Sequence, residues 1–338
     1  MSWLTSDARQ ALRCWRIYAV AVAACVAAAC GEDAPTAPSP PSVLPFALQC
    51  PTDVSGQSFS GSPVSIQVPP PTTVGGVLPF TIACTPTVTA FPVGTTRIAC
   101  QASDARGSAS ACTFNVNVAP PPLSRTSFLA FGDSLTAGEI TVPTTTALTP
   151  GGLPNFKLIV VPAESYPSEL LTMLRARYTT QASQFVVTNA GVPREWAEGG
   201  ASRLPQVMAA TNPQAVLLLE GANDLSALGS RGILPALVAL QSMVRTARGR
   251  GATVFVASLP PPRAGGVNTL PLAQVVSFND QLRVGAPAEG AIFVDVYTAL
   301  AGNINLYMGI DGLHPTEAGY QRMADAFFAA IRSAFEGR

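Results

Sequence analysis

The feature that most constrains this chain is a repeated alternation of apolar runs with helical patterns after residue 126. The runs are continuous, without polar alternation, which is expected of strands covered on both faces. They lie at residues 128–131, 185–188, 215–219, 254–257 and 292–296. Helical patterns lie at residues 168–178, 234–250, 274–285 and 316–335. This order predicts an α/β domain over residues 126–338, with a parallel sheet covered by helices on both sides.

Chemically capable side chains follow these runs, where the reactive loops of a parallel sheet collect. The segments are Gly132-Asp133-Ser134-Leu135, Asn189-Ala190-Gly191, Gly221-Ala222-Asn223-Asp224 and Asp311-Gly312-Leu313-His314. Each has a plain structural interpretation when taken alone, because serine caps helices and Asn-Asp or Asp-Gly pairs form turns. Their occurrence together at strand ends favours a single functional site.

These segments hold the groups that acyl transfer needs: a nucleophile, a base, a group that orients the base, and donors for the developing oxyanion. We predict Ser134 as the nucleophile. His314 is the only histidine in the chain, and Asp311 lies three positions before it. His314 is therefore the base if a histidine serves, and Asp311 can orient it. The predicted oxyanion donors are the backbone N–H groups of Ser134 and Gly191 and the side-chain amide of Asn223.

In these four segments the chain resembles the SGNH hydrolase family, also called the GDSL esterase/lipase family. The resemblance covers residues 126–338. It implies a flavodoxin-like α/β/α sandwich that hydrolyses esters or thioesters through an acyl-enzyme on Ser134, without a metal or other cofactor. The roles that it carries over are base for His314, orienting acid for Asp311, and oxyanion hole for Ser134, Gly191 and Asn223.

One departure from the family pattern concerns the second segment. It continues as Val192-Pro193-Arg194-Glu195-Trp196 where the family commonly has a small glycine-rich turn, so the orientation of the Gly191 amide stays open. Two rival enzyme classes fit less well. An α/β-hydrolase elbow needs G-x-S-x-G, but Thr136 stands two positions after the serine. A dinucleotide site needs its glycines after a strand, whereas the pair at residues 249–251 precedes one.

The substrate is less constrained than the reaction. A stretch at residues 139–165, rich in Thr, Pro, Leu and Val, leaves the loop of the predicted nucleophile. It is either an apolar rim for an acyl chain or a hairpin that only packs on the domain. We expect a carboxylic ester or a carbohydrate O-acetyl ester as substrate. The alternatives are a lipid acyl hydrolase or thioesterase, and a surface adhesin whose hydrolase-like domain only binds.

Residues 45–119 have a different pattern, with short alternating strands at residues 64–68, 80–84, 96–100 and 113–118. Proline and glycine separate these strands, which predicts a small β-sandwich. Four cysteines lie here, Cys50, Cys84, Cys100 and Cys112. An even number in an exported module implies two disulfides, with three possible pairings. A metal site is less favoured because the segment contains no CxxC motif.

This module resembles a hyalin-repeat (HYR) domain, an immunoglobulin-like adhesion module. The matching segments are Cys50-Pro51, Phe91-Pro92-Val93-Gly94-Thr95-Thr96, Ala102-Ser103-Asp104-Ala105-Arg106-Gly107 and Cys112-Thr113-Phe114-Asn115-Val116. The resemblance implies the pairs Cys50–Cys112 and Cys84–Cys100. It leaves open whether the module is a spacer or binds a glycan or another surface protein. A proline-rich linker at residues 120–125 follows the module.

The N-terminal residues predict export. Three arginines precede an apolar run at residues 17–29, which is too short to cross a bilayer but suits a signal peptide over residues 1–29. The segment Ala27-Ala28-Ala29-Cys30 resembles a bacterial lipoprotein signal, with Ala27 where leucine is usual. The resemblance implies lipid attachment at Cys30 and anchoring to a membrane, expected to be the outer membrane on its periplasmic or surface face. Cleavage before Cys25 and ordinary secretion are the alternatives, and residues 30–44 form a proline-rich tether.

Composition excludes several classes of function. The chain has 20 basic and 20 acidic residues, so no long-range field favours nucleic acid. It has one histidine and one lysine, Lys157, and the chain therefore lacks the atoms for a histidine-rich zinc site or a Walker motif.

Overall fold

The computed structural model describes residues 44–148 and 154–337. The signal peptide predicted at residues 1–29 and the lipidation site Cys30 lie outside these residues, as does the tether apart from residue 44. The segment after residue 126 forms a five-stranded sheet in the order β12-β9-β13-β14-β15, in which all neighbours are parallel. The strands are β9 (Ser127–Gly132), β12 (Val186–Gly191), β13 (Ala215–Leu219), β14 (Thr253–Ala257) and β15 (Ile292–Val294). The prediction of a parallel α/β sheet is confirmed.

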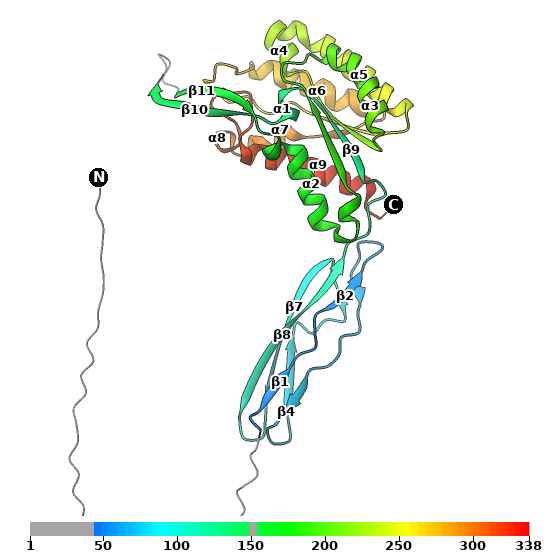
Figure 1. Ribbon diagram of the computed structural model, residues 1–338, viewed down its shortest axis with the longest axis vertical. Helices are drawn as coiled ribbons and strands as arrows, with labels where there is room; N and C mark the ends of the chain where they lie inside the picture. Colours follow the sequence, from blue (N-terminus) through cyan, green and yellow to red (C-terminus); the bar gives the residue numbers. More distant parts are fainter. Residues whose placement is uncertain (1–43, 149–153, 338) are drawn as a thin grey trace, which may run out of the picture. The chain divides into compact units, whose positions relative to one another are not determined.

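Helices cover both faces of this sheet. Figure 1 shows α2 (Tyr166–Arg177) and α9 (Glu317–Phe335) on one side, and α3 (Ala197–Thr211) and α5 (Ile233–Gly249) on the other. The fifth long helix, α6 (Leu272–Ala288), packs on α5. Helix α3 was not expected from the sequence, because Gly199, Gly200 and Pro205 interrupt its helical pattern.

The core explains why these segments fold as they do. Every residue of β13 is buried, as its uninterrupted apolar sequence predicts. Helix α9 turns one apolar face inward, and its Phe327 stacks on Tyr166 of α2 with ring centroids 4.8 Å apart. Each fully buried side chain of this size contributes about 1.5–3 kcal/mol relative to exposure. The core therefore fixes the strand ends that carry the candidate residues.

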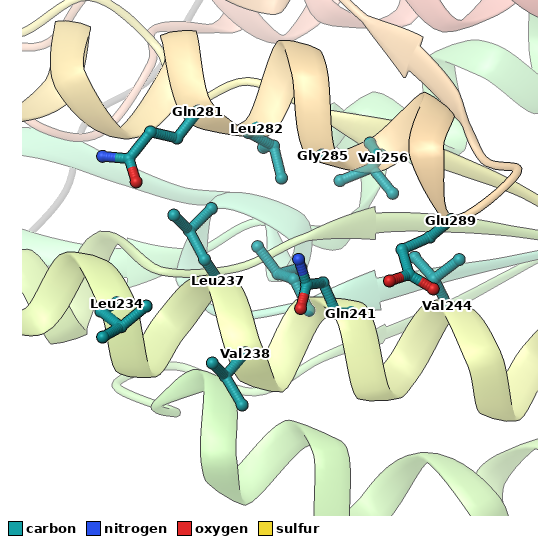
Figure 2. Close-up of a pocket in the computed structure, with 12 residues that line it drawn as sticks. Leu234, Leu237, Val238, Gln241, Val244, Val256, Gln281, Leu282, Gly285 and Glu289 are labelled. Atoms are coloured by element: carbon teal, nitrogen blue, oxygen red, sulfur yellow. The ribbon is translucent and has the colours of Figure 1, made fainter.

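The stretch Ala222–Gly249 has the length and apolar character of a membrane span, with a mean hydropathy of 1.3. It comprises α4 (Ala222–Leu228), a single 3₁₀ turn and α5. Residues Leu240, Met243 and Val244 of α5 are buried in the core, which accounts for the apolar composition. Between α5 and α6 lies a cavity of about 170 Å³, lined among others by Leu237, Val256 and Leu282 (Figure 2). The residues of the candidate site described below do not line it.

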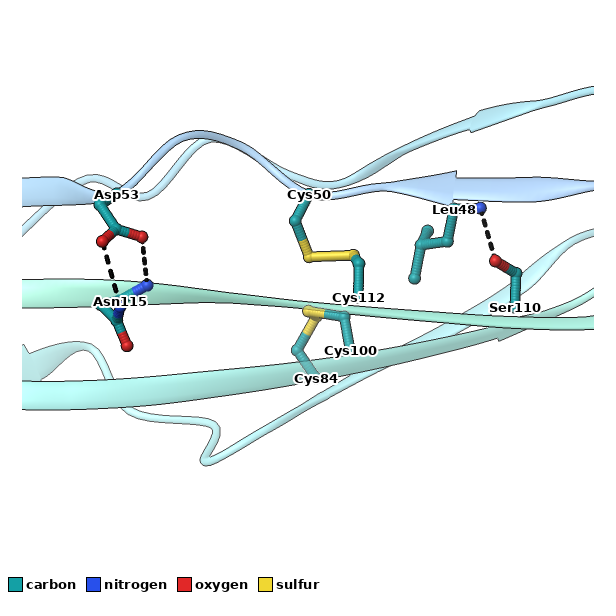
Figure 3. The surroundings of a disulfide bond; sticks show 8 residues. All are labelled: Leu48, Cys50, Asp53, Cys84, Cys100, Ser110, Cys112 and Asn115. Atoms are coloured by element: carbon teal, nitrogen blue, oxygen red, sulfur yellow. Dashed lines mark hydrogen bonds between the residues drawn. A yellow bond between two sulfur atoms is a disulfide. The ribbon is translucent and has the colours of Figure 1, made fainter. Parts of the chain in front are cut away.

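The module at residues 45–119 is an all-β unit. Its main sheet has the order β2-β8-β7-β5, formed by β2 (Val54–Gln57), β8 (Ala109–Ala119), β7 (Gly94–Ser103) and β5 (Thr81–Thr85). Two shorter pairs are β1 (Ala47–Gln49) with β4 (Thr72–Val74), and β3 (Val64–Ser65) with β6 (Ala90–Phe91). Disulfides join Cys50 to Cys112 and Cys84 to Cys100 (Figure 3), the pairing that the resemblance implies. Assignment of the module to the immunoglobulin-like hyalin repeats stays a prediction.

Candidate active site

Ser134 lies on a tight turn from β9 into the short helix α1 (Ser134–Ala137). Asp133 caps this helix, because its Oδ1 accepts the N–H of Leu135 at 2.9 Å. Gly132 is needed before it, since a Cβ there would stand 2.1 Å from the carbonyl oxygen of Leu219 in β13. Ser134 is the first residue of α1, so its N–H has no acceptor within the helix. The turn therefore holds a hydroxyl and an available amide on one residue.

The structure brings Ser134, His314 and Asp311 into one hydrogen-bonded series. Ser134 Oγ lies 2.9 Å from His314 Nε2, and His314 Nδ1 lies 2.6 Å from Asp311 Oδ2. Their exposed fractions are 4%, 3% and 0%, so the series is shielded from bulk water. Residues 134 and 314 are 180 positions apart, and the fold alone unites them.

A compact loop supports the acid and the base. The N–H of Gly309 donates to the carbonyl of His314 at 2.7 Å, and Gly312 has a φ of 92°, which a side chain would strain. Within the loop, the N–H of His314 donates to Asp311 Oδ1 at 3.2 Å. Outside it, Asn268 Nδ2 donates to Asp311 Oδ2 at 3.1 Å. The carboxylate is therefore fixed from three sides, and Asn268 is a contact that the sequence did not reveal.

Burial and hydrogen bonding set the ionisation of this pair. Burial would raise the pKa of Asp311, but hydrogen bonds from His314 and Asn268 outweigh it, so that this pKa lies below its usual value. Burial would lower the pKa of His314, yet hydrogen bonds to Asp311 and Glu139 raise it to about 9. The second of these carboxylates was not expected, and its Oε2 lies 3.2 Å from His314 Nε2.

Gly191 is the third predicted oxyanion donor. Its N–H donates to Asn189 Oδ1 at 3.0 Å, so it must exchange this acceptor for an oxyanion, and its role stays a prediction. The glycine is also required for packing, because a Cβ would lie 2.1 Å from the backbone nitrogen of Ala137 in α1. The turn that follows contains Arg194 with a φ of 66°, a conformation unusual for a residue with a side chain.

Asn223 lies at the start of α4, close to the nucleophile turn. Its Nδ2 donates to Asp133 Oδ2 at 3.2 Å and to the carbonyl oxygen of Glu195 at 2.8 Å. An amide nitrogen has two protons, and both are used here. The predicted donor is therefore beside Ser134 in the fold, and it must exchange one of these acceptors for an oxyanion.

Buried carboxyl groups surround this amide. Burial raises the pKa of Asp133 to about 7 against the opposing effect of its Leu135 hydrogen bond, and the charges of Asp224 and Glu195 add to the increase. Burial, followed by the charges of Asp133 and Glu195, raises the pKa of Glu220 well above its usual value. Within residues 44–148 and 154–337, no group of three or more His, Cys, Asp or Glu side chains could hold a metal ion.

The inserted stretch forms an antiparallel hairpin of β10 (Glu139–Leu148) and β11 (Pro154–Val160). It leaves the nucleophile loop at Gly138, whose φ of 91° is the left-handed cap of α1. The base of the hairpin packs on the domain, since Ile140 lies against the core and Tyr320 donates its hydroxyl proton to the carbonyl of Glu139 at 2.8 Å. The base of the hairpin therefore packs on the domain, and an apolar rim for an acyl chain at its outer part stays a prediction.

Comparisons with known proteins identify a family. The model of the GDSL-like lipase/acylhydrolase family matches residues 130–322, more than half of the chain, and this range includes the candidate residues described above. Esterase TesA of Pseudomonas aeruginosa is 27% identical over 165 residues, which cover 48% of this chain and 77% of the esterase.

Solved structures of hydrolases are similar to part of this chain. A lipase/acylhydrolase from Enterococcus faecalis is 20% identical with a TM-score of 0.50, and the match covers 63% of this chain and 98% of that one. Est24, a carbohydrate acetylesterase from Sinorhizobium meliloti, is 18% identical with a TM-score of 0.48, over 62% and 100% of the two chains. By its matched residues, its sheet and its esterase relative, the chain belongs to the GDSL-like lipase/acylhydrolase family of ester hydrolases.

Proposed function

We propose that this protein hydrolyses carboxylic esters through an acyl-enzyme on Ser134. The observation that supports it best is the unbroken series from Ser134 Oγ to His314 at 2.9 Å and from His314 to Asp311 at 2.6 Å. Neutral His314 takes the hydroxyl proton as the oxygen attacks the ester carbonyl. Asp311 holds the imidazole in the required tautomer and stabilises the cation that forms.

The remaining steps use the same groups. The backbone N–H groups of Ser134 and Gly191 and the side-chain amide of Asn223 donate to the oxyanion of the tetrahedral intermediate. The intermediate collapses, the ester C–O bond breaks, and His314 gives its proton to the departing alcohol. Water then attacks the acyl-enzyme with His314 again as base, which releases the acid and restores Ser134.

Labelling with a fluorophosphonate tests the nucleophile directly. We expect one modified peptide, which carries the label on Ser134, and loss of both labelling and esterase activity in Ser134→Ala, with the fold retained by circular dichroism. Removal of a triad serine lowers kcat by a factor on the order of 10⁶ in a well-studied protease. Undiminished esterase activity in Ser134→Ala would exclude the proposed mechanism. A wild-type protein that binds but never hydrolyses would favour the adhesin alternative.

The preferred acyl chain distinguishes a lipid acyl hydrolase from an O-acetyl esterase. It can be measured as activity against p-nitrophenyl esters from acetyl to palmitoyl. Preference for long chains assigns a lipid acyl hydrolase and excludes carbohydrate deacetylation. Activity on acetate alone assigns an O-acetyl esterase, in which case release of acetate from acetylated polysaccharides should follow.

Export and anchoring are proposed from the sequence. Incorporation of labelled palmitate into the wild-type chain, and its loss in Cys30→Ala, would support lipidation at Cys30. Equal incorporation in both proteins would exclude that residue as the site. A glycan or surface protein as partner of the β module is likewise a proposal from the sequence.

A further inference from the structure

Both ring nitrogens of His314 face a carboxylate. Asp311 Oδ2 lies 2.6 Å from Nδ1, and Glu139 Oε2 lies 3.2 Å from Nε2, the same nitrogen that Ser134 approaches at 2.9 Å. The Glu139 side chain is 15% exposed and the His314 side chain 4%, so water screens their interaction only in part. Glu139 and Ser134 therefore compete for one atom of the base.

The charge state of His314 decides which contact is favourable. A neutral imidazole has one N–H, and if it points to Asp311, Nε2 presents a lone pair to Glu139. Two lone pairs at 3.2 Å repel each other. A cationic imidazole has a proton on each nitrogen and satisfies both carboxylates with charge-assisted hydrogen bonds.

We propose that Glu139 is a positioning residue that binds the Nε2 proton of a cationic His314 in the substrate-free enzyme. It thereby sets the pH at which His314 becomes free to accept the proton of Ser134. This inference rests on the proposed role of His314 as base. It adds a group that acts on the base from the side opposite to Asp311.

The backbone holds Glu139 in this place. It follows Gly138 at the first position of β10, its carbonyl accepts the Tyr320 hydroxyl at 2.8 Å, and it pairs with Val160 across the hairpin. Among the described residues, His314 is the only cationic group paired with the Glu139 carboxylate. Among these residues, His314 is therefore the group whose positive charge can balance the Glu139 carboxylate.

Other groups around His314 favour its cation as well. Asp311 contacts it from the loop before α9, and the Asp133 carboxyl acts on it from the end of β9. Ser134 of α1 is neutral, and burial raises the pKa of Tyr320 in α9 well above its usual value, so the tyrosine stays neutral too. Glu139 is the charged group that contacts Nε2. The pKa of His314, which Asp311 and Glu139 together raise to about 9, agrees with this arrangement.

The charge state of His314 determines how esterase activity depends on pH. General base catalysis needs neutral His314, so activity rises with pH and reaches half of its plateau near the pKa of His314. Removal of one adjacent negative charge lowers that pKa by about one unit or more. The Glu139→Gln variant should therefore gain activity at pH 7, about tenfold for each unit, because the fraction of neutral base rises by that factor.

The single histidine makes the test direct, since in an untagged protein every imidazole signal belongs to His314. We would titrate its ¹⁵N resonances in the wild type and in Glu139→Gln, and record kcat/KM for p-nitrophenyl acetate over the same range. We expect a wild-type midpoint well above the ordinary histidine value of about 6.5, a lower midpoint in Glu139→Gln, and an equal displacement of the acid limb of kcat/KM.

The control is Asp280→Asn on α6, which removes the same charge at an exposed position without an ion pair among the described residues, and should leave the midpoint unchanged. An ordinary wild-type midpoint, or equal midpoints in wild type and Glu139→Gln, would overturn the inference. An ordinary wild-type midpoint overturns the inference even if the variant does not fold. The resonance titration needs no catalysis, so failure of the Ser134 mechanism would be seen separately in the labelling experiment.

Discussion

At the scale of single residues, the acid of the series depends on a neighbour distant in sequence. Asn268 donates to Asp311 Oδ2, the oxygen that also accepts the His314 proton, and its own backbone N–H donates to the carbonyl of Asp311 at 2.8 Å. It therefore fixes both the position and the charge of the carboxylate. Such a residue does not touch the reacting atoms, and its effect is expected in kcat and not in KM.

We predict that Asn268→Ala lowers kcat by about tenfold. The reason is that a hydrogen bond to a charged group contributes about 1.5–3 kcal/mol, part of which is lost from the stabilisation of the His314 cation in the transition state. Steady-state kinetics on a chromogenic ester would measure this. The Asn268→Asp variant should be less active still, since it places a second carboxylate against Asp311. Full activity in both variants would show that Asp311 needs no such support.

Some contacts of the candidate site could be predicted from the sequence, and others could not. Ser134, Asp311 and His314 belong to short motifs at strand ends, so their proximity followed from the topology of a parallel sheet. Glu139 has no motif; it is a lone carboxylate in a segment rich in threonine. The Gly191 N–H donates to the side chain of Asn189 two residues before it, a contact that the motif did not reveal.

At the scale of elements, the close approach of β12 to α1 determines where the nucleophile sits. Helix α1 has four residues and no long packing face of its own. Neighbouring elements hold it in place, and β12 packs so closely against it that a Cβ on Gly191 would lie 2.1 Å from the backbone nitrogen of Ala137. A side chain at this point must displace one element or the other.

We predict that Gly191→Ala destabilises the protein by about 1–3 kcal/mol, the usual cost of overpacking, and lowers esterase activity because α1 moves. Urea unfolding followed by circular dichroism, with activity measured in parallel, would test it. The matched control is Gly302→Ala, where φ is −63° and no atom lies within 4 Å of the added Cβ. Equal stability of the two variants would show that β12 and α1 can separate without penalty.

Elements were predictable to different degrees. The five strands followed from continuous apolar runs, and four of the five long helices followed from their periodicity. Helix α3 did not, because glycines and a proline lie inside it and tertiary packing overrides their low propensity. The end of the last strand was placed too late, since Asp295 caps the next helix by accepting the N–H of Thr298 at 3.0 Å.

At the scale of the whole molecule, covalent stabilisation and chemistry occupy different stretches of the chain. Both disulfides of the described residues lie within residues 45–119, and the candidate residues lie after residue 126. The module has a small core around Leu48, Phe91 and Phe114, so we expect its stability to depend on its disulfides. The α/β domain relies on its own large core.

We predict that reduction of the disulfides leaves esterase activity intact while the β module unfolds more easily. Loss of one native disulfide from a small module costs about 2–5 kcal/mol. Limited proteolysis of the reduced, alkylated protein should cut within residues 45–119 first, and activity should persist in the same sample. The double variant Cys84→Ala with Cys100→Ala should also be cleaved first within residues 45–119 and keep its activity, without a reductant. Parallel loss of activity and of module structure would show that the hydrolase depends on the module.

The strand order β12-β9-β13-β14-β15 has a consequence for the evolution of this enzyme. The chain runs from β9 to one flank of the sheet and then returns past it to the other, which makes the carboxyl end of β9 a topological switch point of the kind beside which α/β proteins bind ligands. The β10–β11 hairpin follows this switch point in the chain, directly after α1. We expect changes in this insertion to leave the sheet and its reacting groups in place. Chimaeras that exchange the insertion between relatives would test whether it determines ester specificity.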